Sequence, residues 1–417
     1  MSERRRVVVT GLGTVNSLGH RVAEFWENLL SCKSGIRPIA RFDASPYASQ
    51  IGGEVQGWSG VQSDQIDARE NKRMDRFAQF AVSSAIEAVD DSGIAFTDAN
   101  RNRCGVLVGS GIGGLEELEN QHLRLLNKGA RFVSPFTVPK LMVNAASGNI
   151  SIIWQLRGPN SATATACASA GNAIGEAIRI IQRNEADVMI TGGSEAALTP
   201  IGLASFCALK GLSTRNDEPH TASRPWDAGR DGFLLSEGAG IIVIEALDHA
   251  RQRSADIYAE LIGYGCSGDG YHISAPDPDG DGAVLAINHA LQDAQVAPDE
   301  VDYVNAHGTS TVLGDLAETV AMKKCFGDHA YKLAVSSTKS STGHLLGASA
   351  GVEIVATTKA LHEGILPATL NLNEPDENCD LDYVPLTPRQ TQVSVALSNS
   401  FGFGGHNACL LLRRFTG

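Results

Sequence analysis

Residues Ser161–Gly171, with the sequence SATATACASAG, form the most informative stretch of the chain. A run of small, β-leaning residues leads into a predicted helix whose apolar face carries Ala170, Ile174, Ala177, Ile178 and Ile181. Cys167 is therefore expected where a strand turns into a helix, facing unpaired N–H groups and the positive end of the helix dipole. A helix start is expected to lower a cysteine pKa below about 8.5, and a thiolate attacks acyl groups well. Cys167 is a candidate nucleophile; taken alone, the segment also fits a buried structural cysteine.

Short apolar strands alternate with amphipathic helices on both sides of this segment. Strands are predicted over Arg6–Thr10, Gly105–Val108, Asp187–Ile190, Ile241–Glu245, Asp302–Ala306, Leu333–Ser336 and Val393–Ser398. A helix is predicted over Asp75–Asp91, with one apolar face and Gly93 at its end. The alternation is typical of an α/β fold with helices on both faces of parallel-rich sheets.

The order of elements repeats along the chain. The first half is expected to contain a helix from Asp75, a strand over 105–108, a helix from Cys167 and a strand over 187–190. The second half is expected to contain a helix from Gly282, a strand over 302–306, a helix from His344 and a strand over 393–398. Residue identity between the halves is poor, so the repeat is one of architecture. We place the boundary near residue 250, giving halves 1–250 and 251–417 that pack tightly because no flexible linker separates them.

Composition excludes several classes of protein. The 417 residues carry a net charge of -13, which argues against general nucleic-acid binding. No stretch approaches 18 apolar residues, so no membrane span is expected. The apolar run after Arg4–Arg6 is too short for an export signal, and we expect a cytoplasmic or organelle-matrix protein. The eight cysteines form no C-x-x-C pair, so neither a disulfide framework nor a metal site is expected.

Two histidines follow predicted strands. His307 lies in Val304–Thr311 (VNAHGTST), and His344 lies in Ser336–Gly347 (SSTKSSTGHLLG). Catalytic groups of parallel α/β sheets gather at the carboxyl ends of strands. Each histidine alone also fits a core position, but two of them at matching strand ends, with Cys167 at a third, favour a shared active site.

Four motifs give the chain a family resemblance: Thr165–Cys167, Asn305–Thr309, Lys339–His344 and Asn399–Gly405. At these positions it resembles the condensing enzymes of fatty-acid synthesis, the beta-ketoacyl-acyl-carrier-protein synthases of the thiolase-like superfamily, and their type II members most closely. The resemblance covers essentially the whole chain. It implies a five-layered αβαβα fold built from duplicated halves, a homodimer, acyl carrier protein as partner, and no cofactor.

The resemblance also implies roles in a decarboxylating condensation. Cys167 would take an acyl group from a carrier thioester, and malonyl carrier protein would lose carbon dioxide to give the attacking enolate. His307 and His344 would donate hydrogen bonds to the enolate oxygen. The backbone N–H groups of Cys167 and Phe403 would hold the acyl oxyanion. Lys339 would order this cluster.

Further residues are expected around the substrate and its carrier. Phe403, between glycines, resembles a gate, and Ile112 resembles the residue on the pocket floor that limits chain length. Thr309 and Thr311 would donate to the phosphopantetheine arm. Phe401 and Glu353 are also placed near the substrate, with Glu353 able to hold Lys339 or its loop. The basic residues expected to dock the acidic carrier are Lys72, Arg73, Arg131 and Lys210.

Some signals favour other interpretations. Gly109–Gly114 fits G-x-G-x-x-G but lacks a clear acidic ribose ligand, and Asp277–Gly282 resembles a calcium loop without its closing glutamate. His406, where other family members carry threonine, is interpreted as a loop variation. The open alternatives are a type I synthase and a polyketide-type condensing enzyme. A chain-length factor would have lost the nucleophile, whereas Cys167 is present.

Overall fold

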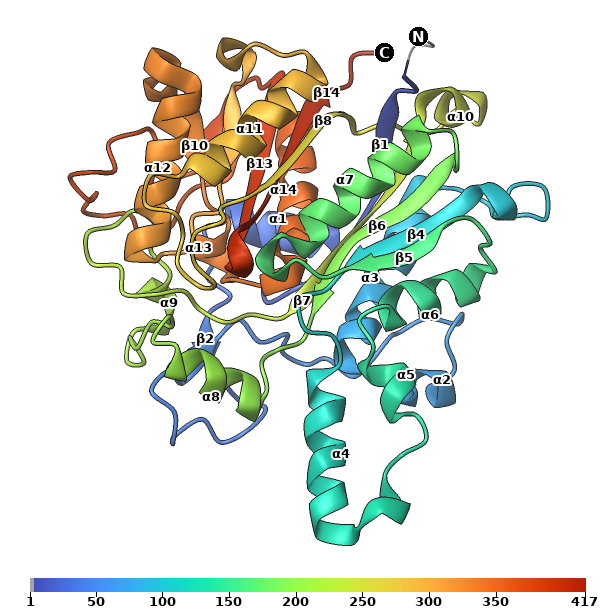
Figure 1. Ribbon diagram of the computed structural model, residues 1–417. Helices are drawn as coiled ribbons and strands as arrows, with labels where there is room; N and C mark the ends of the chain where they lie inside the picture. Colours follow the sequence, from blue (N-terminus) through green and yellow to red (C-terminus); the bar gives the residue numbers. More distant parts are fainter. Residues whose placement is uncertain (1–3) are drawn as a thin grey trace.

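The computed structural model describes residues 4–417, so Met1–Glu3 lie outside it. Within these residues ten strands form one hydrogen-bonded sheet (Figure 1). Its order is β10-β9-β13-β14-β8-β1-β7-β6-β4-β5. The sheet consists of two sets of five strands that meet at the short antiparallel pairing of Val7–Val9 in β1 with Ala259–Leu261 in β8.

The two sets have the same topology. The first comprises β1 (Val7–Val15), β4 (Cys104–Gly109), β5 (Asn160–Thr163), β6 (Val188–Glu195) and β7 (Gly238–Ala246). The second comprises β8 (Ala259–Gly268), β9 (Tyr303–Asn305), β10 (Ala334–Ser336), β13 (Val395–Gly402) and β14 (His406–Arg414). In each set the second strand pairs in parallel with both the third and the fourth. The fifth strand pairs antiparallel with both the fourth and the first. The predicted architectural repeat is therefore present in the strand order.

Helices form three further layers around the strands. Between the two sets lie α7 (Ser169–Gln182) and α14 (Ser349–Glu363), and α7 contacts strands of both sets. Outside the first set lie α3 (Arg76–Ser92) and α6 (Ala145–Trp154), and outside the second lie α11 (Asp281–Ala294) and α12 (Val312–Phe326). Separate buried apolar clusters fill the interfaces between layers. The predicted five-layered αβαβα fold is confirmed.

The predicted strands and the first helix match observed elements closely. Helix α3 begins after Asp75, whose carboxylate accepts from the Phe77 N–H at 3.2 Å, and ends at Gly93, which has a φ of 63°. Strand β5 matches the β-leaning run expected before Cys167, whereas β8 and β14 of the large sheet were not predicted. The second-half helix begins at Ser349 and not at His344, because the backbone first makes a 3-10 turn over Leu346–Ala348. Cys167 likewise lies in a 3-10 turn, Ala166–Ala168, ahead of α7.

These two turns are the same structure repeated. Ala166 and Leu346, which start them, both have positive φ, 48° and 50°, a conformation that non-glycine residues adopt rarely. The sequences are ACASAG from residue 166 and LGASAG from residue 346, so identity between the halves is locally high. Gly347 is the counterpart of Cys167. The proposed division at residue 250 stays a prediction, since one sheet spans both halves.

The other elements surround this body. They are α1 (Val22–Leu30), α2 (Ala68–Lys72), α4 (Leu115–Lys128), α5 (Thr137–Leu141), α8 (Pro200–Ala208), α9 (Pro219–Ala222), α10 (Leu247–Gln252), α13 (Lys339–Thr342), and the short strands β2 (Arg37–Pro38), β3 (Ile51–Gly52), β11 (Ile365–Leu366) and β12 (Arg389–Gln390). Helix α4 and the turn after it project from the body (Figure 1). None of the helices within residues 4–417 has the length and apolar character needed to cross a membrane.

Candidate active site

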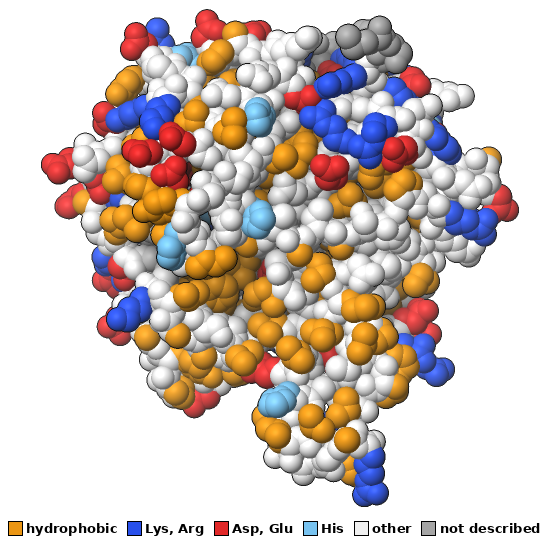
Figure 2. Space-filling view, viewed as in Figure 1, with side chains coloured by type: hydrophobic (Ala, Val, Ile, Leu, Met, Phe, Trp, Pro, Cys, Tyr) orange, Lys and Arg blue, Asp and Glu red, His pale blue; other side chains and the backbone are white. Residues whose placement is uncertain are grey.

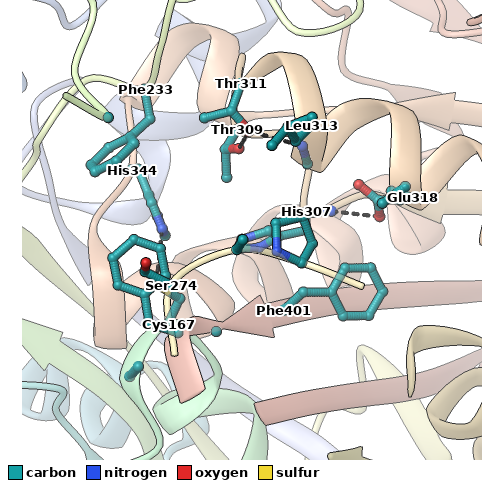
Figure 3. A pocket seen from close by; sticks show the side chains of 18 of the residues that line it. Cys167, Phe233, Ser274, His307, Thr309, Thr311, Leu313, Glu318, His344 and Phe401 are labelled. Atoms are coloured by element: carbon teal, nitrogen blue, oxygen red, sulfur yellow. Dashed lines mark hydrogen bonds between the residues drawn. The ribbon is translucent and has the colours of Figure 1, made fainter. Parts of the chain in front are cut away.

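Cys167, His307 and His344 line one cavity of about 530 Å³. The Nε2 atom of His344 lies 3.1 Å from the Sγ atom of Cys167. The rings of His307 and His344 are nearly perpendicular, with centroids 5.3 Å apart. Figure 3 shows both imidazoles beside the cysteine, each coming from a different loop. The three residues that the sequence singled out therefore meet, although 177 positions separate Cys167 from His344.

Cys167 is buried at the start of α7, where the chain packs closely. A Cβ atom on Gly402 would lie 2.9 Å from the Cys167 nitrogen, so only glycine lets the β13 end approach the nucleophile turn. Burial raises the pKa of the thiol to about 11, against the opposing effects of the Phe403 and Cys167 backbone N–H groups and of Lys339. The expectation that the helix start lowers this pKa is wrong for the unacylated protein, because desolvation of the thiolate outweighs the helix-end N–H groups.

The position of the proton on His344 follows from its contacts. Its Nδ1 atom accepts from the Leu346 backbone N–H at 3.3 Å and contacts the Ser349 hydroxyl at 2.9 Å. Nδ1 is thus the unprotonated nitrogen, and Nε2 carries the hydrogen that faces Cys167. Burial, and then the positive charge of Lys339, lower the His344 pKa well below its ordinary value. His344 is a neutral donor toward the cavity.

His307 is held through its backbone. The Glu318 carboxylate accepts from the His307 N–H at 2.9 Å and from the Gly308 N–H at 2.8 Å. Burial, Lys339 and His344 lower the pKa of the imidazole well below its usual range. Its Nδ1 atom is buried without a hydrogen-bond partner among residues 4–417, and the ring of Phe401 lies 5.8 Å away. A second neutral imidazole therefore faces the same space.

Lys339 and Glu353 form a buried ion pair behind the histidines. They are 1% and 2% exposed, and neither lines the cavity. Glu353 therefore does not lie against the substrate space where it was placed; its partner is Lys339, the other contact considered for it. Burial, and then the lysine charge, lower the pKa of both histidines, so Lys339 adds to the effect that keeps the two imidazoles neutral.

The cavity walls contain most of the other predicted residues. Ile112, Thr309, Thr311, Phe401 and Phe403 all line it. Thr311 is the N-cap of α12 and accepts from the Gly314 N–H at 3.2 Å, while the Thr309 and Thr311 hydroxyls lie 3.0 Å apart. Phe403 is 38% exposed, so it lies between the cavity and solvent. The position of Ile112 as a pocket floor stays a prediction.

The four predicted docking residues do not gather at one place in the protomer. Lys210 lines the cavity, whereas Lys72 and Arg73 end α2, and Arg131 follows α4. The Arg73 guanidinium lies 4.9 Å from the Phe136 ring centre, and that of Arg131 lies 4.8 Å from the Phe132 ring centre. All four are exposed.

The sequence interpretation missed three residues that build the site: Glu318, Ser349 and Glu195. Ser349 could have been found from the repeat, since it matches Ser169 in the shared sequence ASAG. Glu318 gives a weaker signal, because it lies 11 residues after His307 on α12, a helix that was not predicted from the sequence. Glu195 gives no signal in the sequence, because it stands at the end of a buried strand and its hydrogen-bond partners lie far away along the chain.

Comparison with known proteins agrees with this geometry. The family model described as "Beta-ketoacyl synthase, N-terminal domain" matches residues 4–250, and "Beta-ketoacyl synthase, C-terminal domain" matches residues 258–373. The chain is 51% identical over 412 residues to 3-oxoacyl-(acyl-carrier-protein) synthase 2 of Coxiella burnetii, with 99% of each chain covered. It is 50% identical over 413 residues to the protein of the same name from Synechocystis, again with 99% of each covered.

Solved structures agree as well. One is a type II polyketide ketosynthase in complex with its acyl-carrier protein, with a TM-score of 0.92 at 33% identity, covering 99% of this chain and 100% of that one. Another is a beta-ketoacyl synthase from Burkholderia phymatum, with a TM-score of 0.92 at 35% identity and the same coverage. The resemblance inferred from four motifs is confirmed over the whole chain, which belongs to the beta-ketoacyl synthase family.

Proposed function

We propose that this enzyme joins an acyl chain to a malonyl unit held on acyl carrier protein, with loss of carbon dioxide, in fatty-acid elongation. The observation that carries the proposal is the contact of a neutral His344 Nε2–H with the Cys167 sulfur, beside a second neutral imidazole. Relatives that are 48 to 51% identical over 99% or more of their length carry the name 3-oxoacyl-(acyl-carrier-protein) synthase 2.

The first step is acyl transfer to Cys167. The sulfur attacks the carrier thioester, the carbon–sulfur bond to the carrier breaks, and the thiol proton passes to the departing carrier thiolate. Because burial raises the Cys167 pKa to about 11, the charge must be stabilised as it forms. The N–H groups of Phe403 and Cys167 already favour the charged sulfur, and they are suitably placed for the oxyanion of the tetrahedral intermediate.

The second step is decarboxylation of the malonyl thioester. As carbon dioxide leaves, negative charge moves onto the thioester oxygen, and N–H donors there lower the barrier. His344 offers its Nε2–H, and His307 is the second donor. Burial keeps each imidazole neutral, and the charge of Lys339, which forms an ion pair with Glu353, adds to this effect.

The third step forms the carbon–carbon bond. The enolate carbon attacks the carbonyl of acyl-Cys167, the bond to sulfur breaks, and the sulfur takes up a proton to regenerate the thiol. The product is a 3-oxoacyl chain two carbons longer on the carrier. Burial of the three side chains limits the access of water, which would hydrolyse the acyl-enzyme.

A fatty-acid substrate is favoured over a polyketide substrate. The full-length relatives named synthase 2 are 48 to 51% identical to this chain, whereas the ketosynthase of the type II polyketide complex is 33% identical. An acyl chain also suits the apolar residues of the cavity lining, which include Ile112, Phe206 and Leu209. A type I synthase would differ in its preferred chain length, and acyl-chain profiling separates the two.

The acyl carrier protein is the proposed partner. The solved complex of a related ketosynthase with its carrier supports such docking in this fold. Thr309 and Thr311 line the cavity together with exposed Lys210, a basic residue that an acidic carrier would contact. Lys72, Arg73 and Arg131 stay predicted contacts.

A homodimer is the proposed assembly. Strand β5 is an edge of the sheet, paired only with β4 among the described residues. Exposed apolar side chains lie on the elements that precede it: Leu118, Leu123, Leu125, Leu126, Phe132, Phe136, Val138, Met142 and Ile152. Figure 2 shows hydrophobic side chains over the projecting α4 region. We propose that a second copy of this chain covers this surface, named here the α4–α6 surface, because an unpaired edge beside an exposed apolar patch is typical of an interface. A cytoplasmic location stays a prediction.

The test uses Cys167→Gln with malonyl and long-chain acyl carrier protein. We expect loss of condensation with decarboxylation retained, because the glutamine removes the sulfur and leaves both histidines in place. His307→Ala should lose decarboxylation as well. His406→Ala is the control for a histidine deletion, since His406 does not line the cavity. Condensation by Cys167→Gln would reject the nucleophile.

A further inference from the structure

The Glu195 carboxylate is buried at the end of β6 and bridges two loops of the active site. Its Oε2 atom accepts from the Gly111 N–H at 2.7 Å and the Gly347 N–H at 3.1 Å. Its Oε1 atom accepts from the Ser110 hydroxyl at 3.0 Å and the Ile112 N–H at 3.2 Å. Glu195 is 0% exposed and is not part of the cavity lining, so it acts on the cavity only through these loops.

The two loops have separate tasks in the proposed reaction. The loop 110–113 carries Ile112, which lines the cavity and is the residue predicted to limit the acyl chain length. The loop 344–347 joins His344 to α14. They touch directly, because a Cβ atom on Gly347 would lie 2.3 Å from the Gly111 nitrogen and 2.8 Å from Glu195 Oε2. The carboxylate is therefore the acceptor that two converging N–H groups require, and without it both would be buried unpaired.

The internal repeat has no carboxylate at the corresponding position of the second half. Gly347 matches Cys167, so Glu195 lies against the turn that precedes α14 as the sulfur lies in the turn that precedes α7. Burial raises the pKa of Glu195 to about 7, against the opposing effect of its N–H and hydroxyl donors. Strand β13 ends at Gly402 where β6 ends at Glu195, and Gly402 approaches the Cys167 nitrogen. At the turn before α7, Gly402 lies beside the proposed nucleophile Cys167. At the matching turn before α14, Glu195 lies beside Gly347.

We propose that Glu195 is a positioning residue that holds the Ile112 turn against the His344 loop and thereby limits the acyl chain length that the enzyme accepts. The inference rests on the proposed condensing function. Three of the four groups that donate to the carboxylate belong to Ser110, Gly111 and Ile112, and the fourth belongs to the loop of His344. When this link weakens, the Ile112 turn can yield to a longer chain.

The test measures acyl transfer to Cys167 from octanoyl and palmitoyl carrier protein. Glu195→Gln keeps the volume but turns an NH₂ group toward N–H donors, so one pair of donors loses its acceptor. We expect the ratio of kcat/KM for palmitoyl over octanoyl to rise roughly tenfold. Malonyl decarboxylation should change far less. Ser110→Ala removes one donor, has little risk of misfolding, and should shift the ratio in the same direction by a smaller factor.

Asp75→Asn is the matched control. Asp75 is also a buried carboxylate that accepts from two backbone N–H groups, those of Phe77 at 3.2 Å and Glu117 at 2.9 Å, outside the cavity lining. It should lower the melting temperature and leave the palmitoyl-to-octanoyl ratio unchanged. An unchanged ratio in both Glu195→Gln and Ser110→Ala would overturn the inference, as would an equal shift in Asp75→Asn. Failure of the wild type to condense would reject the proposed function, and the inference with it.

Discussion

At the scale of single residues, the chemistry depends on how burial changes the proton affinity of three side chains. Cys167 holds its proton more tightly than a free cysteine, whereas His307 and His344 hold theirs less tightly. All three shifts have burial as their largest cause, because each charged form loses hydration. The resting site is therefore neutral at these three positions, and its donors are ready for charge that develops during the reaction.

The first prediction concerns the alkylation of Cys167 by iodoacetamide. Since only the thiolate reacts and the Cys167 pKa is about 11, the rate should rise about tenfold per pH unit from neutral pH up to about 10. Peptide mapping by mass spectrometry measures this rate at Cys167, and exposed Cys266 in the same sample provides an internal comparison. A rate at Cys167 that levels off near pH 8 would contradict the raised pKa.

At the scale of elements, regular strands and helices could be predicted from the sequence, but irregular ones could not. Helix α3 has an apolar face and caps at both ends, so its bounds followed from local signals. Strand β8 was missed because glycines interrupt its pattern. Glycine is required at positions 263 and 265 because α11 packs closely against them. Cβ atoms there would lie 2.5 Å and 2.1 Å from the carbonyl oxygens of Ala290 and Ala286. That reason lies in tertiary packing, which the local sequence does not show.

The residues of the site also differ in whether the local sequence could reveal them. Cys167, His307, His344 and Lys339 stand in motifs with their own local signals. Glu195 contacts a residue 152 positions away, and its neighbours Val188–Ser194 look like any buried strand. Its role depends on two loops that meet only in the folded chain.

The second prediction concerns α2, the short helix that ends with Lys72. None of its five residues is buried, so its stability depends on its capping box. Asp67 Oδ1 accepts from the Arg69 and Glu70 N–H groups, both at 2.7 Å. Asp67→Ala should cost about 1 kcal/mol and unwind α2 without removing any basic residue.

The measurement compares KM for carrier-bound acyl substrate with KM for a small acyl thioester. If Lys72 and Arg73 dock the carrier, Asp67→Ala should raise only the KM for the carrier-bound substrate. This increase should be smaller than that caused by the double reversal Lys72→Glu with Arg73→Glu. Equal changes in both KM values would remove α2 from the docking surface.

At the scale of the whole molecule, the same αβαβα body uses its two halves for different purposes. One half supplies Cys167, the proposed nucleophile, just before a helix start, and the other supplies both histidines and the Lys339–Glu353 pair. Helices α7 and α14 pack between the two sets of strands, so the turns at their N-termini are held against each other. The exposed apolar side chains of the α4–α6 surface are left uncovered by the rest of the protomer, which is why we assign this surface to a second copy.

The third prediction tests that assembly. Ile152 on α6 is 72% exposed, so a charge there costs the folded protomer little but would be buried unpaired in a dimer. Ile152→Glu should sediment as one chain at concentrations where the wild type sediments as two. Leu285→Glu is the control, since Leu285 on α11 is 46% exposed and lies on the outer face of the second half. A wild type that sediments as a single chain, or a two-chain Ile152→Glu variant, would show that this surface has another partner or none.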